Sequence, residues 1–275
     1  MSYKSILVNL QLGKTNGGAL AVAGDLAERF NAHVLGVAMY RPVQVCETEA
    51  YLMSDLAARD REGRQREIAA AEHEFRVLME GRAKSLGWHS GLTNKTLAAA
   101  VVDHARSADL LVAGADRNKN LFDTPSSLGP GDLVMQAGRP VFVVPDTVER
   151  LSLDHVLIGW KDGPEARRAI ADALPLLTKA GRVTVVEVAP EADLASARSH
   201  LNDVVEWLGR HGVSAEALPV AGADAPARLR GVSADLEADL IVAGAYAHSR
   251  LQEWIMGGVT RDLLLHTHLC SMVSR

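Results

Sequence analysis

Short runs of apolar residues alternate with longer segments of helical periodicity along the whole chain. Residues 6–8, 33–40 and 110–113 are apolar with little polar alternation, which is typical of parallel strands buried on both faces. Segments with helical spacing, such as 17–30, connect these runs. The pattern therefore predicts an α/β fold, with right-handed crossovers and helices covering a parallel sheet.

The same pattern predicts five strands in each half of the chain. The strands are expected at 6–8, 33–40, 89–92, 110–113 and 141–144, and then at 156–158, 183–188, 214–218, 240–243 and 269–273. Helices are expected at 17–30, 56–86 and 96–106, and then at 165–179, 194–208, 225–237 and 259–266. Residues 41–55 are predicted to form a long loop, which either covers a site or is an ordinary surface excursion.

The two halves are copies of one unit. The sequence ADLLVAGA at 108–115 returns as ADLIVAGA at 238–245, and the spacing from Gly114 to Pro140 equals that from Gly244 to Cys270. Such self-similarity indicates a tandem duplication. We therefore predict two domains, 1–146 and 153–275, separated by a polar boundary after Pro145, each long enough to bury a core.

Composition narrows the class of protein. The chain is 48% hydrophobic and 4% aromatic with a net charge of −5, which is typical of a soluble α/β protein without a nucleic-acid surface. The richest basic run, 59–66, is interleaved with acidic residues and is interpreted as a solvated helix face. No apolar run is long enough for a membrane span, and Cys46 and Cys270 do not resemble a disulfide framework, so we expect a cytoplasmic protein.

The second half carries a candidate phosphate loop. In open parallel sheets ligands bind at the carboxyl ends of the strands, and here Gly244 is followed further on by Gly257, Gly258, Val259 and Thr260 at the start of a predicted helix. Glycines let the backbone approach an anion, and a helix start offers unpaired N–H groups. Glycines are also common in turns that bind no ligand. In the same loop His248 either faces a phosphate or only solvates the turn.

This loop resembles the nucleotide-binding loop of the universal stress protein family, Gly-x-x-Gly, nine residues, then Gly-Ser/Thr. The similarity is greatest to the bacterial tandem members, which have counterparts of residues 160–162 and 165–169. The resemblance implies two tandem Rossmann-like domains, each a five-stranded sheet of order 3-2-1-4-5, whose last strands pair as an internal pseudo-dimer. It also implies a stress-response role and association of two chains as a homodimer.

Several positions depart from the family pattern. Ala247 stands at the second Gly, Gly258 at the Ser/Thr, and Lys161 where ATP-binding members place an Asp, with Asp162 one residue later. Losing a hydroxyl and a carboxylate removes contacts of about 1–3 kcal/mol each. ATP or another adenine nucleotide is therefore a weakened expectation, while the backbone of Gly257 and Gly258 still suits a small anion.

The first half departs further. Its first strand ends in Asn9, Leu10 and Gln11, and its glycine pair is displaced to 129–131, so this half is interpreted as degenerate for nucleotide. Arg117 and Lys119 either attract an anion or form an exposed basic turn.

Other chemistry finds little support. No dinucleotide-binding glycine pattern, P-loop or nucleophile elbow is present. His266, His268 and Cys270 have metal-binding side chains but straddle a helix end and a strand start, so no metal site is predicted. Three functions remain: a regulatory protein that binds a small anion, a scaffold with vestigial sites, and a slow ATP hydrolase, for which no water-activating base is evident. Catalysis is not predicted.

Overall fold

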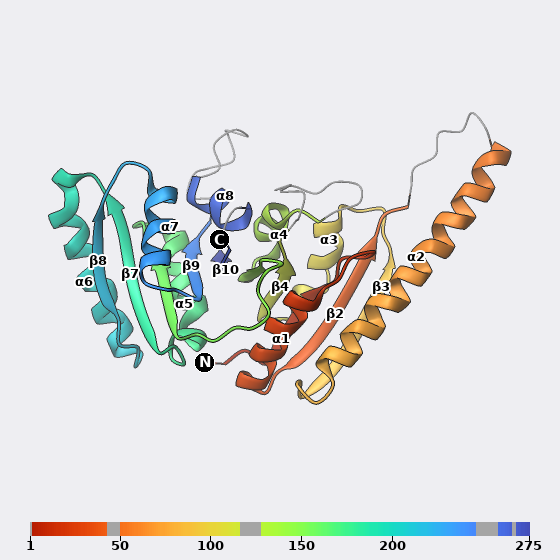
Figure 1. The fold of residues 1–275 in the computed structure, drawn as a ribbon, viewed down its shortest axis with the longest axis horizontal. Coiled ribbons are helices and arrows are strands. Elements are labelled where there is room, and N and C mark those ends of the chain that lie inside the picture. Colours follow the sequence, from red (N-terminus) through yellow and green to blue (C-terminus); the bar gives the residue numbers. More distant parts are fainter. Residues whose placement is uncertain (1, 43–49, 116–127, 246–257, 266–267) are drawn as a thin grey trace.

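One ten-stranded sheet runs through the whole chain. The computed structural model describes residues 2–42, 50–115, 128–245, 258–265 and 268–275. Strand order is β3-β2-β1-β4-β5-β10-β9-β6-β7-β8 (Figure 1). The strands are β1 (Ser5–Asn9), β2 (His33–Tyr40), β3 (Ser85–Leu92), β4 (Leu110–Gly114), β5 (Val141–Val144), β6 (His155–Gly159), β7 (Arg182–Ala189), β8 (Glu216–Ala221), β9 (Leu240–Gly244) and β10 (Cys270–Ser274).

Each half has the predicted strand order 3-2-1-4-5, which confirms the fold class. Neighbouring strands within a half are parallel. The halves meet where β5 and β10 pair antiparallel, with Phe142 opposite Met272 and Val143 opposite Ser271. We call this contact between β5 and β10 the seam. The predicted pairing of the last strands is therefore confirmed.

Helices cover both faces of the sheet. They are α1 (Gly17–Phe30), α2 (Ala50–Met79), α3 (Leu97–Val102), α4 (Pro130–Ala137), α5 (Pro164–Leu177), α6 (Leu194–Arg210), α7 (Ala225–Asp235) and α8 (Gly258–Leu265), with 3-10 turns at Ala105–Ser107 and Glu191–Asp193. Side chains of α1, α2, α5 and α6 share one core on one face, and α3, α4, α7 and α8 pack on the other. None of the helices in the described ranges combines the length and hydropathy needed to cross a bilayer.

The two halves share that first core, whereas one cluster on the other face belongs to the second half alone. The shared core runs from Tyr3 through Phe142 and Leu151 to Met272. The Tyr3 hydroxyl donates to the carbonyl of Asp172 in α5, 2.6 Å away across the halves. The boundary segment is also tied down, because Arg29 donates to the carbonyl of Leu151 at 2.8 Å. The polar boundary thus contains a buried anchor, Leu151, which is 1% exposed.

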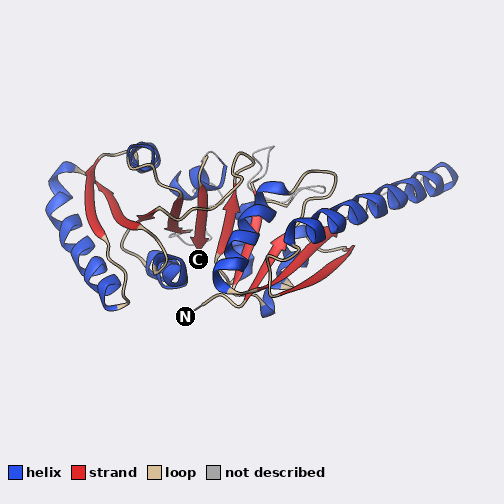
Figure 2. Cartoon of the chain, turned by 60° about the horizontal axis from the view of Figure 1, so that its bottom comes forward, coloured by secondary structure: helices blue, strands red, loops and turns tan. Residues whose placement is uncertain are grey.

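The long helix differs from its prediction at both ends. It spans Ala50–Met79, so the loop predicted at 41–55 is shorter and the helix predicted to reach residue 86 stops earlier (Figure 2). Gly81 has a φ of +73°, a left-handed conformation that follows many helix ends, and β3 begins at Ser85. The short helix α4 was not predicted, although Pro130 at its first turn and Gly138 at its C-terminal cap are typical helix-boundary residues.

Candidate functional site

In the second half, the glycine that ends β9 is required by packing. A Cβ atom on Gly244 would lie 2.6 Å from the backbone nitrogen of Ala166 and 2.6 Å from the carbonyl carbon of Glu165. The start of α5 can therefore approach β9 only because residue 244 has no side chain. This accounts for Gly244 without a ligand.

Lys161 and Asp162 lie between β6 and α5, at the same edge of the sheet. Both residues are exposed, and Asp162 forms an ion pair of 2.7 Å with Arg167 of α5. The carboxylate nearest to the family's Asp position is thus already occupied by a cation of its own chain. Both side chains of this ion pair are about half exposed, so the pair contributes little to stability.

The described part of the phosphate loop is the start of α8. Val259 is half-buried and Thr260 is buried, and Asp262 of the same helix is held by Arg230 of α7. Gly258 is the first residue of α8. Ala247, His248 and Gly257 lie outside the described residues, as do Arg117 and Lys119 of the first half. The phosphate-loop site remains a prediction.

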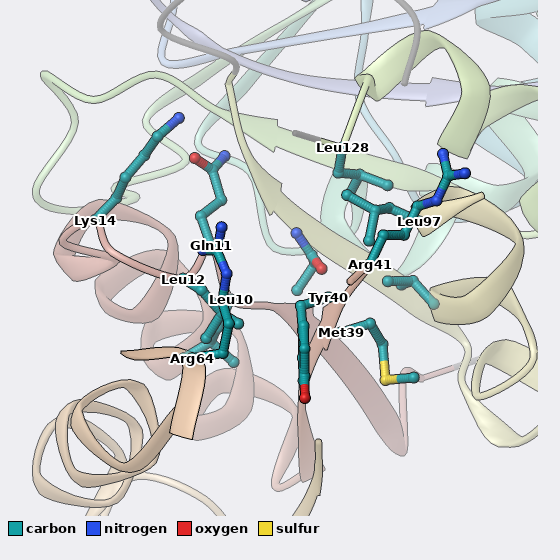
Figure 3. Close-up of a pocket in the computed structure, with 12 residues that line it drawn as sticks. Leu10, Gln11, Leu12, Lys14, Met39, Tyr40, Arg41, Arg64, Leu97 and Leu128 are labelled. Atoms are coloured by element: carbon teal, nitrogen blue, oxygen red, sulfur yellow. The ribbon is translucent and has the colours of Figure 1, made fainter. Parts of the chain in front are cut away.

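The first half, in contrast, has an open pocket at the carboxyl ends of β1 and β2 (Figure 3). Three cationic side chains line it: Lys14 from the loop after β1, Arg41 from the end of β2, and Arg64 from α2. None of the 12 lining residues is acidic. Arg64 is paired with Glu67 at 2.7 Å, so Lys14 and Arg41 carry most of the uncompensated positive charge among the lining residues. We call this hollow the cationic pocket.

Part of the lining of the cationic pocket is apolar. Leu10, Leu97, Val101 and Leu128 line it and are all buried, and Met39 beside them is half-buried. Leu97 and Val101 belong to α3, whose start is capped by the Thr96 hydroxyl accepting from the amide of Ala99. The pocket therefore combines positive charge with a buried hydrocarbon surface.

The loop after β1 is held in place by buried polar contacts. The Asn16 side chain accepts from the amide of Gln11 at 2.8 Å and donates to a carboxylate oxygen of Glu74 at 3.2 Å. Gln11 in turn reaches the carbonyl of Gly114 at the end of β4, with a donor–acceptor distance of 3.4 Å. Gln11 and Lys14 are thus presented from an ordered turn.

A second pocket, which Gln11 also lines, lies against the start of α1. Asp146 and Glu149 line this pocket together with Gly17 and Gly18 of the helix. Two carboxylates offset the positive end of the helix dipole, so the arrangement is less suited to an anion than the cationic pocket.

Sequence reasoning missed the cationic pocket. Arg64 belongs to the basic run that was interpreted as a solvated helix face, and Arg41 and Lys14 carried no motif. The position of Arg41 directly after the second predicted strand was the available signal, because carboxyl ends of parallel strands meet at one edge. The interpretation of the first half as degenerate concerned nucleotide only, and it stays a prediction.

A stacked histidine pair supports the α3 wall of the cationic pocket. His89 of β3 and His104, just after α3, stack with ring centroids 4.8 Å apart. Burial and then the charge of His89 lower the pKa of His104, while Asp103 raises it and Arg106 lowers it further. Asp103 is itself paired with Lys95 and Arg106. The neutral form of His104 is therefore favoured in the folded protein.

This pair predicts a pH dependence of stability. His104 contributes fully above the ordinary histidine pKa of about 6.5, and the contribution is lost as the pH falls through the lowered folded-state pKa. His104→Phe keeps a ring but cannot titrate. We expect it to reduce the loss of unfolding free energy between about pH 7.5 and about pH 5 by a few tenths to 1 kcal/mol, measured by urea unfolding. His73→Phe on the exposed face of α2 should leave that loss unchanged, and an equal effect of both would contradict the prediction.

The metal-type residues near the C-terminus do not form a cluster in the described part of the chain. His268 is exposed, whereas Cys270 is buried and its burial raises the pKa of the thiol to about 12. A thiol in that state is protonated and a poor metal ligand. No group of three or more metal-binding side chains occurs among the described residues, and His266 lies outside them.

Comparison with solved structures identifies the fold. A universal stress protein from Archaeoglobus fulgidus DSM 4304 matches with a TM-score of 0.72 and 15% identity over 98% of each chain. A functionally unknown protein from Pseudomonas aeruginosa PAO1 matches with a TM-score of 0.63 and 17% identity, over 99% of this chain and 92% of the other. A proposed universal stress protein from Pseudomonas aeruginosa UCBPP-PA14 gives a TM-score of 0.63 and 18% identity, over 99% and 93%.

No protein-family model matches the sequence, and no curated protein matches it at a significant level. The structural matches extend over nearly the whole chain, seam included. The chain therefore has the fold of the universal stress proteins, in two tandem copies joined through one sheet.

Proposed function

We propose that the protein is a cytoplasmic, non-catalytic regulatory protein of the stress response that holds a small anionic ligand at the carboxyl edge of its sheet. The observation that carries this proposal is the cationic pocket, which Lys14, Arg41 and Arg64 line from three different elements. In α/β folds ligands bind at the carboxyl ends of the parallel strands, and cations that line such a pocket favour an anion. The stress-response part of the proposal is supported by the fold, which is that of the universal stress proteins.

The second-half loop remains a further proposed anion site. Gly258 begins α8, so the first amides of that helix have no partner within it and suit an anion. Adenine nucleotide is the weaker ligand there because Lys161 replaces the family's Asp and Asp162 is paired with Arg167. We propose that two chains associate through surfaces other than the seam, since the seam is already filled within one chain.

Titration of inorganic phosphate and AMP into the full-length protein tests the proposal. Replacing both Lys14 and Arg41 by methionine removes two charged contacts while keeping much of the side-chain volume, and should weaken binding in the first half by about tenfold or more. Gly257→Val is the corresponding change in the second half. Arg76→Met is the control, because Arg76 lies on α2 but pairs with Glu72 away from the pocket.

The outcomes separate the two functional classes. Binding that is lost with the Lys14/Arg41 double variant and kept with Arg76→Met supports an anion-holding protein. If neither phosphate nor AMP binds the folded protein at millimolar concentration, the proposal fails. The scaffold function would then be favoured, consistent with the packing role of Gly244 and the internal pairing of Asp162.

A further inference from the structure

We infer that the cationic pocket selects an anion with an apolar body, of the aryl or alkyl phosphate or carboxylate class, in preference to an adenine nucleotide. This inference rests on the proposed function, because it names the kind of anion that the same pocket holds. Three features of the pocket carry it: the signs of its charges, the apolar part of its lining, and the small number of side-chain oxygens that can accept a hydrogen bond.

The charges of the pocket suit an anionic head but not a ribose. Ribose hydroxyls and the adenine amine are hydrogen-bond donors, and a carboxylate is the strongest acceptor that a protein can offer them. The lining residues include three cations and no carboxylate. Asn9, at the end of β1, is buried and supplies only an amide at that position. The pocket thus favours negative charge and offers little to a sugar.

The lining also offers hydrocarbon side chains to the rest of the ligand. Leu97, Val101 and Leu128 are each less than 9% exposed, and Met39 adds a half-buried thioether side chain. Figure 3 shows Lys14 and Arg41 on opposite sides of the opening, with Leu97 and Leu128 beside Arg41. A ligand whose charged group meets these cations can therefore place an apolar group against the side chains of α3.

The polar groups at the rim are partly satisfied within the chain. Gln11 uses its amide nitrogen on the Gly114 carbonyl, and Arg64 is held by Glu67. Among the lining residues only Asn9, Gln11 and Tyr40 carry side-chain oxygens that can accept from a ligand hydroxyl, so a hydroxyl-rich ligand would leave donors unpaired, which costs affinity. A ligand with an apolar body has no such donors to satisfy.

Four probes of graded chemistry test the inference by calorimetric titration of the full-length protein: phenyl phosphate, inorganic phosphate, AMP and phenol. Burying the ring should make phenyl phosphate bind about tenfold more tightly than inorganic phosphate. Phenyl phosphate should also bind more tightly than AMP, and phenol, which lacks the charged group, should bind least. AMP binding as tightly as phenyl phosphate would overturn the inference.

Two variants assign the preference to the pocket. Met39→Gln makes the apolar part of the lining more polar, and it should reduce the phenyl phosphate advantage over inorganic phosphate to about threefold or less. Met135→Gln on α4 is the matched control, because Met135 does not line the pocket. If phosphate binds but the phenyl group adds nothing, the inference fails and the proposed function stands. If no anion binds, the proposed function fails as well.

Discussion

Replacing Phe142 by alanine should lower the free energy of unfolding by about 3–5 kcal/mol, the usual cost of removing a buried aromatic ring. Phe142 is fully buried and faces the core that both halves share, at the register position opposite Met272. The cavity would open in the seam, so the loss should reach both halves. Calorimetry should show one lowered transition, and amide hydrogen exchange should show reduced protection in both β1 and β6.

Phe75→Ala is the matched control for this prediction. Phe75 is equally buried, but it belongs to α2 and packs against Trp88 of β3, far along the sheet from the seam. It should cost a similar free energy while lowering protection mainly in the first half. If Phe142→Ala left the protection of β6 unchanged, the two halves would unfold independently. The shared core would then not couple their stabilities.

The central strands could be predicted from the sequence more accurately than the edge strands. The prediction for β2, at 33–40, and for β5, at 141–144, agrees with the structure at every residue. Both are nearly continuous apolar runs, because helices cover both faces. The prediction for the edge strand β3 begins four residues late but ends correctly at Leu92, and that for β8 is two residues early at its start and three at its end. Both strands are half-exposed and contain Gly87, Gly91 or Pro219.

The candidate site could be predicted only where a local motif marks it. The glycines of the second half form a recognisable spacing, and their neighbourhood was found. The cationic pocket draws Lys14, Arg41 and Arg64 from three separate segments, and nothing in their sequence spacing relates them. Arg64 reaches that pocket because α2 packs against β2 and, at Glu67, against Gly13 in the loop after β1. Such a site depends on tertiary structure, so a local pattern does not reveal it.

The repeated sequence ADL also has a structural role that the sequence did not reveal. In the first half, the Asp109 carboxylate accepts from the backbone amides of Lys4 and Ser5, at 2.7 and 3.0 Å. In the second half, Asp239 accepts from the amide of His155 at 2.9 Å and from the Ser152 hydroxyl at 2.7 Å. Each Asp thus fastens the start of the first strand of its own half.

We therefore expect Asp109→Ala and Asp239→Ala each to lower the free energy of unfolding by about 2–3 kcal/mol, because each leaves two donors without their charged acceptor. Asparagine at either position keeps one acceptor oxygen and should cost less than half as much. Asp235→Ala, at an exposed residue of α7, is the control and should change stability by less than about 0.5 kcal/mol. Urea unfolding of the three alanine variants and the double variant measures this.

The double variant decides whether the two aspartates act separately. Each belongs to a different half and shares no hydrogen-bond partner with the other, so their effects should add within about 0.5 kcal/mol. A cost of Asp109→Ala or Asp239→Ala no larger than that of Asp235→Ala would mean that the repeated Asp has no anchoring role. If the double variant loses much more stability than the two single variants together, the two sites are energetically coupled. The shared core would then carry that coupling, because it joins β1 and β6 across the seam.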